Sequence, residues 1–247
     1  MEVLKFNLGG RTAFFKKPDV NQYLYFSYGN IHKIALLGIL GAVLGYQGYN
    51  QQKRNEGAIY PEFYEKLYNI KIGISPKNDK GYIPKKVQTF NNSVGYANKH
   101  KGGNLVVKEQ WLENPNWDIY VLINGELEDK LAKRIINSEF CYIPYLGKND
   151  HLANISDSKI IKEANLLSDV SSINSLFIRD YFDLQIVEDD IEDDYVPIYK
   201  YQEMLPTELD GTTNQYILKP FIYTNSSLIK QGEPLVYRCK EENIFFF

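Results

Sequence analysis

The alternation of apolar and polar positions in residues 1–150 predicts a series of strands and helices. Five stretches have the apolar content and spacing of strands, and they begin at positions 3, 67, 104, 117 and 141: VLKFNLGG, LYNIKIGI, NLVVKEQ, WDIYVLI and CYIPYL. Two other stretches, residues 31–46 and residues 126–136, have helical spacing instead. Asn30 is the expected N-cap of the first of these helices.

A segment rich in turn residues interrupts this series at about residues 75–104. Its prolines and glycines predict a protruding hairpin or a long loop. Without this insertion, and with residues 104–123 taken together as one strand region, the remaining order is strand, helix, strand, strand, helix, strand. That order is typical of the ferredoxin-like α+β fold, in which two helices back a four-stranded antiparallel sheet. We therefore expect residues 1–150 to form one domain of this class.

The expected helix at residues 31–46 carries glycines at positions 38, 41, 45 and 48, which fall along one face. Glycine weakens a helix, so this stripe predicts a very close neighbour, either a sheet or another backbone. A phosphate-binding loop is disfavoured because no Gly-Lys-Ser/Thr ending follows. The apolar stretch from Ile34 to Tyr46 is shorter than the roughly 20 residues that cross a bilayer, so no membrane contact is expected.

Residues 151–247 predict a smaller, β-rich and acidic region. Residues 158–182 suggest a short helix and a strand, and the later runs YVPIYKY, YILKPFIY, PLVYRC and NIFFF have strand character. The acidic run EDDIEDD at residues 188–194 is typical of a solvated loop. Its functional alternatives are an edge that repels RNA or a surface for a basic protein.

Charge is divided unevenly along the chain, whose net formal charge is −3. Residues 1–150 hold 20 Lys and Arg against 14 Asp and Glu, whereas residues 151–247 hold 8 against 17. The segment from Lys71 to Lys108 contains eight lysines and one acid, Asp79, interleaved with tyrosine and phenylalanine. Lysines meet phosphates and aromatic rings stack on bases, so this segment favours a polyanion contact over a merely solvated face.

Three stretches together resemble a known family: FNLGGRTAFFKKP, HKIALLGILGAVLGYQGY and YIPYLGKNDHLANI. They are similar to the Cas five family of CRISPR-associated proteins in the RAMP superfamily, with the nearest likeness to members from type I-B systems, over most of residues 1–155. The resemblance implies an RRM-like, ferredoxin-like fold whose inserted hairpin, the thumb, precedes the third strand. It also implies a subunit that caps the 5′ handle of CRISPR RNA within the Cascade surveillance complex.

The partners implied by this resemblance are the CRISPR RNA, the repeated backbone subunit, the large subunit and, through the complex, target DNA. No cofactor is implied. The two cysteines are too few for a disulfide framework and no Cys/His spacing resembles a zinc site, so a reducing cytoplasm is the expected location.

The resemblance also implies residues that contact RNA, carried over position by position. The start of the first helix is expected to be exposed, as is the turn after Gly147. The residues expected at the handle are Arg11, Lys16, His32, Lys33, Lys148 and Asn149, and those expected on the thumb are Lys85, Lys86, Lys99 and Lys101. Asp150 and His151 have a structural interpretation, as a turn residue and a packed or capping imidazole.

Three other functions stay open in the sequence. One branch of the family, from type I-C systems, resembles a ribonuclease using Tyr, Lys and His, for which this chain offers Tyr46, Lys99 and His100. A metal-dependent nuclease would combine Asp150 and His151 with the acids of EDDIEDD. A free-standing RNA-binding module is the third. We expect a non-catalytic subunit, because acid/base chemistry requires a geometry that sequence proximity does not provide.

Overall fold

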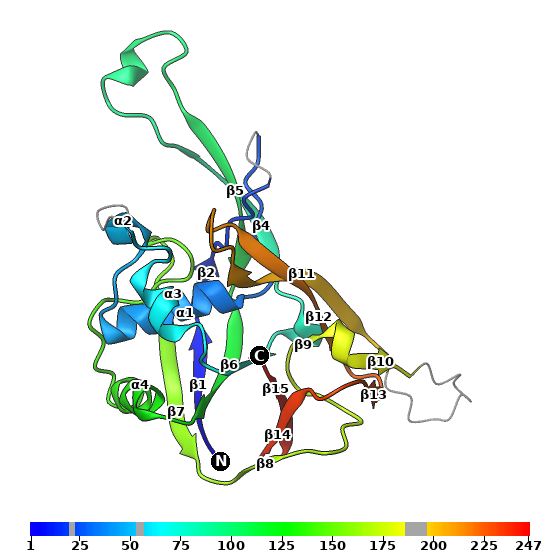
Figure 1. Cartoon of the computed structure of the whole chain (residues 1–247). Coiled ribbons are helices and arrows are strands. Elements are labelled where there is room, and N and C mark those ends of the chain that lie inside the picture. Colours follow the sequence, from blue (N-terminus) through cyan, green and yellow to red (C-terminus); the bar gives the residue numbers. More distant parts are fainter. Residues whose placement is uncertain (20–22, 53–56, 186–196) are drawn as a thin grey trace.

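The computed structural model of the protein describes residues 1–19, 23–52, 57–185 and 197–247. It is an α+β structure with mostly antiparallel sheets and few helices (Figure 1). The central sheet has the order β3-β6-β1-β7, and each neighbouring pair is antiparallel. Its strands are β1 (Glu2–Gly9), β3 (Ile72–Pro76), β6 (Asn116–Ile123) and β7 (Asn154–Ile161).

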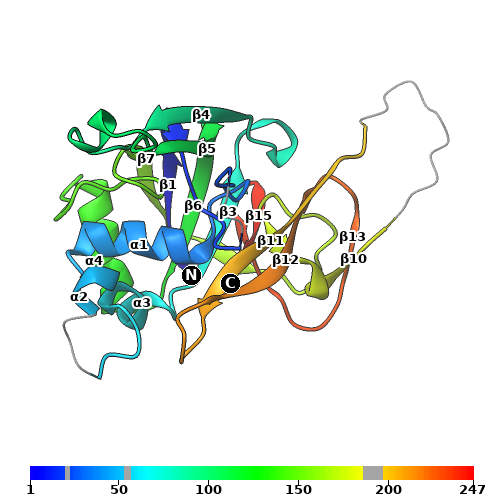
Figure 2. The same ribbon diagram turned by 90° about the horizontal axis from the view of Figure 1, so that it is seen from above.

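Alternation along β1 explains which side of the sheet the helices cover. Leu4, Phe6 and Leu8 point to one face and join a buried cluster with the apolar side chains of the helices. The helices are α1 (Lys33–Leu44), α2 (Tyr49–Gln52), α3 (Glu62–Leu67) and α4 (Glu126–Ile136). Figure 2 shows them gathered at one end of the molecule. None of the helices in the described residues is long and apolar enough to cross a membrane.

Helix α1 begins one residue after His32, whose Nδ1 atom accepts a hydrogen bond from the amide of Ala35 at 3.3 Å. The prediction of Asn30 as the N-cap was therefore wrong. Asn30 is buried instead, where its amide oxygen accepts from the Trp117 indole at 2.8 Å. The helix ends at Gly45, which has the left-handed conformation (φ +86°) that favours glycine.

Of the two neighbours predicted for the glycine stripe, a sheet or another backbone, the structure has the second, since the stripe meets helix α3 and Cys141. A side chain at Gly41 would overlap Phe63 of α3, and one at Gly45 would lie 3.0 Å from the sulfur of Cys141. Gly38 has no neighbour within 4 Å. The stripe therefore serves close packing at two positions and leaves the helix backbone open at a third.

The predicted insertion is present as a hairpin that projects from the body of the molecule (Figure 1). Its arms are β4 (Lys85–Asn91) and β5 (Val106–Glu113), preceded by the 3₁₀ turn η1 (Asp79–Gly81) and joined across η2 (Ala97–Lys99). The short strand β2 (Thr12–Ala13) pairs with β5 at the root. The stretch NLVVKEQ thus forms the second arm, so the insertion ends later than the predicted residue 104.

The prediction of a strand at CYIPYL was wrong. Residues 141–146 form an irregular segment whose only regular pairing within the described chain is the isolated bridge Tyr145↔Leu152. Pro144 cannot donate to a sheet ladder, and its carbonyl oxygen instead accepts from the amide of Ala153 at 3.0 Å. The fourth strand of the sheet is β7, which lies beyond the predicted boundary at residue 150. A division into two domains stays a prediction, with its border moved to the end of β7.

The C-terminal region is β-rich, as predicted. Its elements are β8 (Ala164–Leu166), β9 (Phe177–Ile178), η3 (Arg179–Tyr181), β10 (Phe182–Leu184), β11 (Lys200–Leu209), β12 (Tyr216–Thr224), β13 (Leu228–Lys230), β14 (Leu235–Cys239) and β15 (Glu242–Phe246). The short helix expected within residues 158–182 is wrong as an α-helix, because only the 3₁₀ turn η3 occurs there. The acidic run at 188–194 lies outside the described residues.

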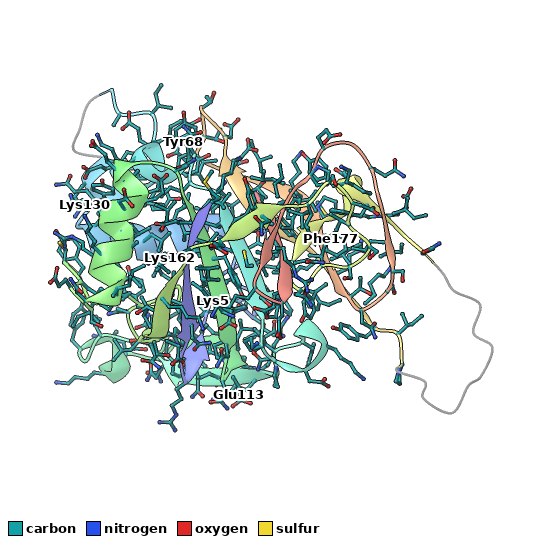
Figure 3. All side chains as sticks on the ribbon, turned by 90° about the horizontal axis from the view of Figure 1, so that it is seen from below. Lys5, Tyr68, Glu113, Lys130, Lys162 and Phe177 are labelled. Atoms are coloured by element: carbon teal, nitrogen blue, oxygen red, sulfur yellow. The ribbon has the colours of Figure 1, made fainter. Side chains whose placement is uncertain are left out.

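Strands β14 and β15 cover the second face of the central sheet. Val3 and Tyr120 of the sheet pack in one buried cluster with Ile244 and Phe246 of β15. On the same face lies Lys5, which is labelled in Figure 3. Its ammonium contacts Asp118 and Glu242, each at 2.9 Å. RRM-type sheets present bases with an open face of this kind. In this protein β14 and β15 cover that face around Val3 and Tyr120.

Candidate nucleic-acid interface

The candidate surface for a strand of nucleic acid is a groove of about 1210 Å³ between the hairpin, α1 and residues 142–150. The hairpin contributes one face only, because directly opposed residues of an antiparallel pair share a side. Phe90 and Val107 are such a pair, and both line the groove. On the opposite wall Gly38 leaves the backbone of α1 open.

Aromatic and apolar side chains are unusually exposed along this groove. Tyr142 and Ile143 are 57% and 75% exposed, and Tyr145 is exposed as well. Such surface is costly in water unless a partner covers it, and aromatic faces are suited to stacking on bases. Sequence reasoning missed these residues, because it interpreted their apolar pattern as a buried strand.

Two lysines line the groove, and both were among the predicted contacts. The Lys16 ammonium lies 4.0 Å from the ring centroid of Tyr25, which also lines the groove. Tyr25 is fixed along β5, since its amide donates to the carbonyl oxygen of Lys108 at 2.9 Å. Lys16 and Tyr25 thus form a cation–π pair beside β5.

The second lysine, Lys148, is already paired. Its ammonium lies 2.9 and 3.1 Å from the two carboxylate oxygens of Glu109 on β5. The Trp111 indole donates to the same carboxylate at 2.8 Å. Glu109 was not a predicted site residue, and no local pattern could have identified it, because its partner is 39 residues away. Asn149, the next residue, is exposed as expected.

His151 is buried and belongs to the support of the groove. Its Nδ1 atom lies 2.7 Å from the Thr12 hydroxyl, and its ring stands edge-on to Trp111 at 4.6 Å between centroids. Burial lowers the pKa of His151, and the neighbouring Lys148 ammonium lowers it further. The imidazole is therefore neutral near pH 7, in agreement with its structural interpretation.

The start of α1 is not exposed, so this part of the prediction was wrong. His32 and Lys33 are both buried. The His32 ring packs 5.3 Å from that of Tyr216, and burial lowers the pKa of His32 to about 3. Burial also lowers the pKa of Lys33 to about 8, and its ammonium lies 5.8 Å from the ring centroid of Phe247. C-terminal residues thus cover both side chains.

The thumb lysines divide into two groups. At the root, burial lowers the pKa of Lys85 against the attraction of Glu203, and Lys86 pairs with Glu113 at 3.1 Å. At the tip, Lys99 and Lys101 are exposed, and residues 80–108 contain no Asp or Glu. The tip is therefore the part of the hairpin with cations free to meet phosphates. Arg11, in the turn between β1 and β2, is exposed as well.

The alternative catalytic residues are not brought together around one site. Tyr46 lines the groove, whereas Lys99 and His100 lie at the hairpin tip, which projects away from α1 (Figure 1). Within the described ranges no group of three His, Cys, Asp or Glu residues could hold a metal ion.

Solved structures share the fold, and two of them match over more than nine-tenths of this chain. A chain described as "CRISPR RNA-guided surveillance complex" matches with a TM-score of 0.53 at 10% identity, over 92% of this chain and 91% of that chain. A CRISPR protein from Archaeoglobus fulgidus matches with a TM-score of 0.51 at 10% identity, over 99% and 98% of the two chains. No family model and no curated protein matches the sequence. At this identity the likeness extends to the fold alone.

Proposed function

We propose that this protein is the CRISPR RNA-binding subunit of a type I Cascade surveillance complex, of the Cas five family and of subtype I-B. It caps the 5′ handle of the CRISPR RNA and nucleates assembly of the complex. The observation that carries the proposal is an aromatic groove, one wall of which is a hairpin whose residues 80–108 contain lysines and no Asp or Glu. The fold shared with a chain of an RNA-guided surveillance complex supports it.

The topology supports the finer assignment of the fold. The chain order β1, α1, β3, β6, α4, β7 and the sheet order β3-β6-β1-β7 are those of a ferredoxin-like, RRM-like domain. The hairpin β4–β5 lies between the second and third strands of that sheet and corresponds to the thumb. We infer that RNA uses the groove beside the thumb, because β14 and β15 cover the sheet face.

The two parts of the site would contribute different terms to RNA affinity. The lysines of the tip meet phosphates, which gives a salt-dependent contribution with little sequence preference. The aromatic side chains of the groove meet unpaired bases, which are available for stacking in single-stranded RNA and not in a duplex. Selectivity for the handle would therefore reside in the groove.

Within this proposal the neighbours are the repeated backbone subunit and the large subunit, with target DNA nearby and no cofactor. The complex is cytoplasmic. The competing function is a metal-independent endoribonuclease that processes precursor CRISPR RNA. It would require Tyr46 to approach Lys99 and His100, for example by closure of the hairpin onto bound RNA.

The test uses purified protein and end-labelled repeat RNA, with and without EDTA, against a scrambled RNA of equal length. We expect tight binding, selectivity for the repeat and no cleavage. Cleavage within the repeat in the presence of EDTA would replace the proposal by the endoribonuclease. Equal binding of both RNAs would remove the handle assignment, and no binding at any salt concentration would remove the function altogether.

A further inference from the structure

The groove proposed to hold RNA contains as many acidic as basic side chains. Lys16 and Lys148 line it, and so do Glu109 and Asp150. His32 adds no charge near pH 7, because its pKa is about 3. A surface that neutralises phosphates normally excludes carboxylates, which repel the backbone. The acidic groups in this groove therefore require an explanation.

The pair of Lys148 and Glu109 is arranged so that the cation is the accessible partner. The Lys148 side chain is 33% exposed and that of Glu109 is 7% exposed. The ammonium lies over two rings, 5.6 Å from the Phe14 centroid and 5.4 Å from the Phe90 centroid. Asp150 is a third, longer contact at 3.7 Å. A ligand in the groove thus reaches the ammonium without displacing any backbone.

Both partners are held on rigid supports. Gly147 has a left-handed conformation (φ +91°), and the turn closes through bonds from Leu146 to His151 at 2.7 Å and from His151 to Lys148 at 3.0 Å. On the other side the Trp111 indole fixes the Glu109 carboxylate in the β5 arm. A flexible four-carbon side chain joins these supports, so the ammonium can change partners while the backbone stays in place.

The geometry points to Glu109 as a specificity-determining residue, an internal anion that occupies Lys148 in place of an RNA phosphate. An RNA phosphate binds Lys148 only when the rest of the strand is seated well enough to displace the carboxylate. A polyanion that does not fit the groove does not displace the carboxylate and obtains no binding energy from Lys148. The protein therefore discriminates better between fitting and non-fitting strands, at a cost in affinity for both. This inference rests on the proposed function and concerns the same groove.

The test compares wild type, Glu109→Gln, Lys148→Met and the double variant on repeat RNA and on oligouridylate of equal length. Gln keeps an oxygen that accepts from Trp111 and removes the charge. We expect E109Q to tighten oligouridylate binding by roughly three- to tenfold and repeat binding by less, because one phosphate contact becomes available to any strand. In the K148M background the same substitution should have no effect. E109D, with a shorter side chain, should give an intermediate gain if E109Q proves unstable.

The control is Glu233→Gln, which removes one negative charge from an exposed side chain that lies 3.7 Å from Lys230. It should leave both affinities within twofold, because a distant surface charge is screened. Weaker or unchanged oligouridylate binding by E109Q would overturn the inference and make the pair a simple clasp of the hairpin. An equal gain in the K148M background would overturn it too. If wild type and every variant bind neither RNA, the proposed function itself fails.

Discussion

The amide of Phe14 donates to the carbonyl oxygen of Leu146 at 3.1 Å, and this contact joins the segment directly after β2 to the turn that presents Lys148. Gly147 makes the close approach of these two backbone segments possible. A Cβ atom at this position would overlap the carbonyl oxygen of Phe14, and the backbone is left-handed there. One backbone contact thus sets where the accessible cation of the groove lies.

Gly147→Ala is accordingly expected to destabilise the protein. The left-handed conformation and the overlap with Phe14 should together lower the free energy of unfolding by about 2 kcal/mol or more. Denaturant unfolding measures this change. Gly95→Ala is the matched control, since Gly95 lies in the hairpin with open space around it, and it should change stability by less than about 0.5 kcal/mol. Equal stability of the two variants would contradict the assigned role of Gly147.

Charge reversal at the hairpin tip should weaken RNA binding in a salt-dependent way. The variant K99E/K101E/K108E changes three exposed lysines, two at the tip and one on the β5 arm, and leaves Lys85 and the pair of Lys86 with Glu113 unchanged. For single-stranded RNA each lost phosphate contact should reduce the slope of log affinity against log salt by about 0.7. Titrations at several salt concentrations give this slope.

The control for this variant reverses Lys159 and Lys162, which are exposed on and just after β7. Figure 3 shows Lys162 on the underside of the molecule, viewed from the side opposite Figure 2. These substitutions should leave the salt slope unchanged. A similar loss of affinity in both variants would mean that overall charge matters, and not the hairpin.

The buried His32 predicts a loss of stability in mild acid. Its pKa is about 3 in the folded protein, against 6.5 for an unperturbed histidine, so below pH 6.5 the unfolded chain binds a proton that the folded chain does not. Stability should therefore fall as the pH drops from about 6.5 toward 3, by up to about 1.4 kcal/mol per pH unit from this group. Packed against it are Tyr28 and Tyr216, whose phenols do not titrate in this range.

His32→Asn tests this assignment, because asparagine is a good N-cap that does not titrate. The variant should lose stability at pH 7 through the missing ring. Its unfolding free energy should nevertheless depend less steeply on pH, because unfolding takes up as much as one proton fewer than in the wild type. Denaturant unfolding between pH 7 and pH 4 gives both quantities. An unchanged pH dependence would show that His32 does not carry the effect.

Periodicity was sufficient to predict the elements that bury one regular face. The bounds of α4 agree with the prediction, because Leu131, Ala132 and Ile135 meet the core at helical spacing. CYIPYL failed for the opposite reason, since Tyr142, Ile143 and Tyr145 are apolar yet face the groove. The strand β7 is largely polar, and its pairing with β1 cannot be inferred from its own sequence.

The site was less predictable because its decisive contacts are distant in sequence. A motif next to α1 suggested an exposed His32 and Lys33, but Tyr216 and Phe247 from the C-terminal region lie over them. The lysines of the hairpin can be counted in the sequence. The carboxylates that pair with Lys86 and Lys148 are identified only by the fold, which places both of them on β5. Composition therefore located the basic segment, and the fold decided which of its charges are free.

The ion network under the C-terminal strands provides a final prediction. Burial opposes the charged form of Lys5, but its bonds to Asp118 and Glu242 outweigh that effect and raise its pKa. Burial likewise opposes the charge on each carboxylate, and the hydrogen bonds that each receives leave its pKa lowered. Lys5→Met would leave two carboxylates without their shared cation. Because the network is partly exposed, we expect a loss of about 1–3 kcal/mol in unfolding free energy at pH 7.

The pH dependence of this loss separates charge from packing. Carboxylates with a lowered pKa stabilise the fold above their unfolded pKa near 4, and this contribution disappears as the pH falls through their folded values. The penalty of Lys5→Met should therefore shrink in acid, as the carboxylates protonate, and should be partly relieved at pH 7 by adding Asp118→Asn and Glu242→Gln. Denaturant unfolding at pH 7 and pH 4 measures both. A penalty that is constant with pH and unaffected by the added substitutions would assign the role of Lys5 to packing of its methylene groups under β15.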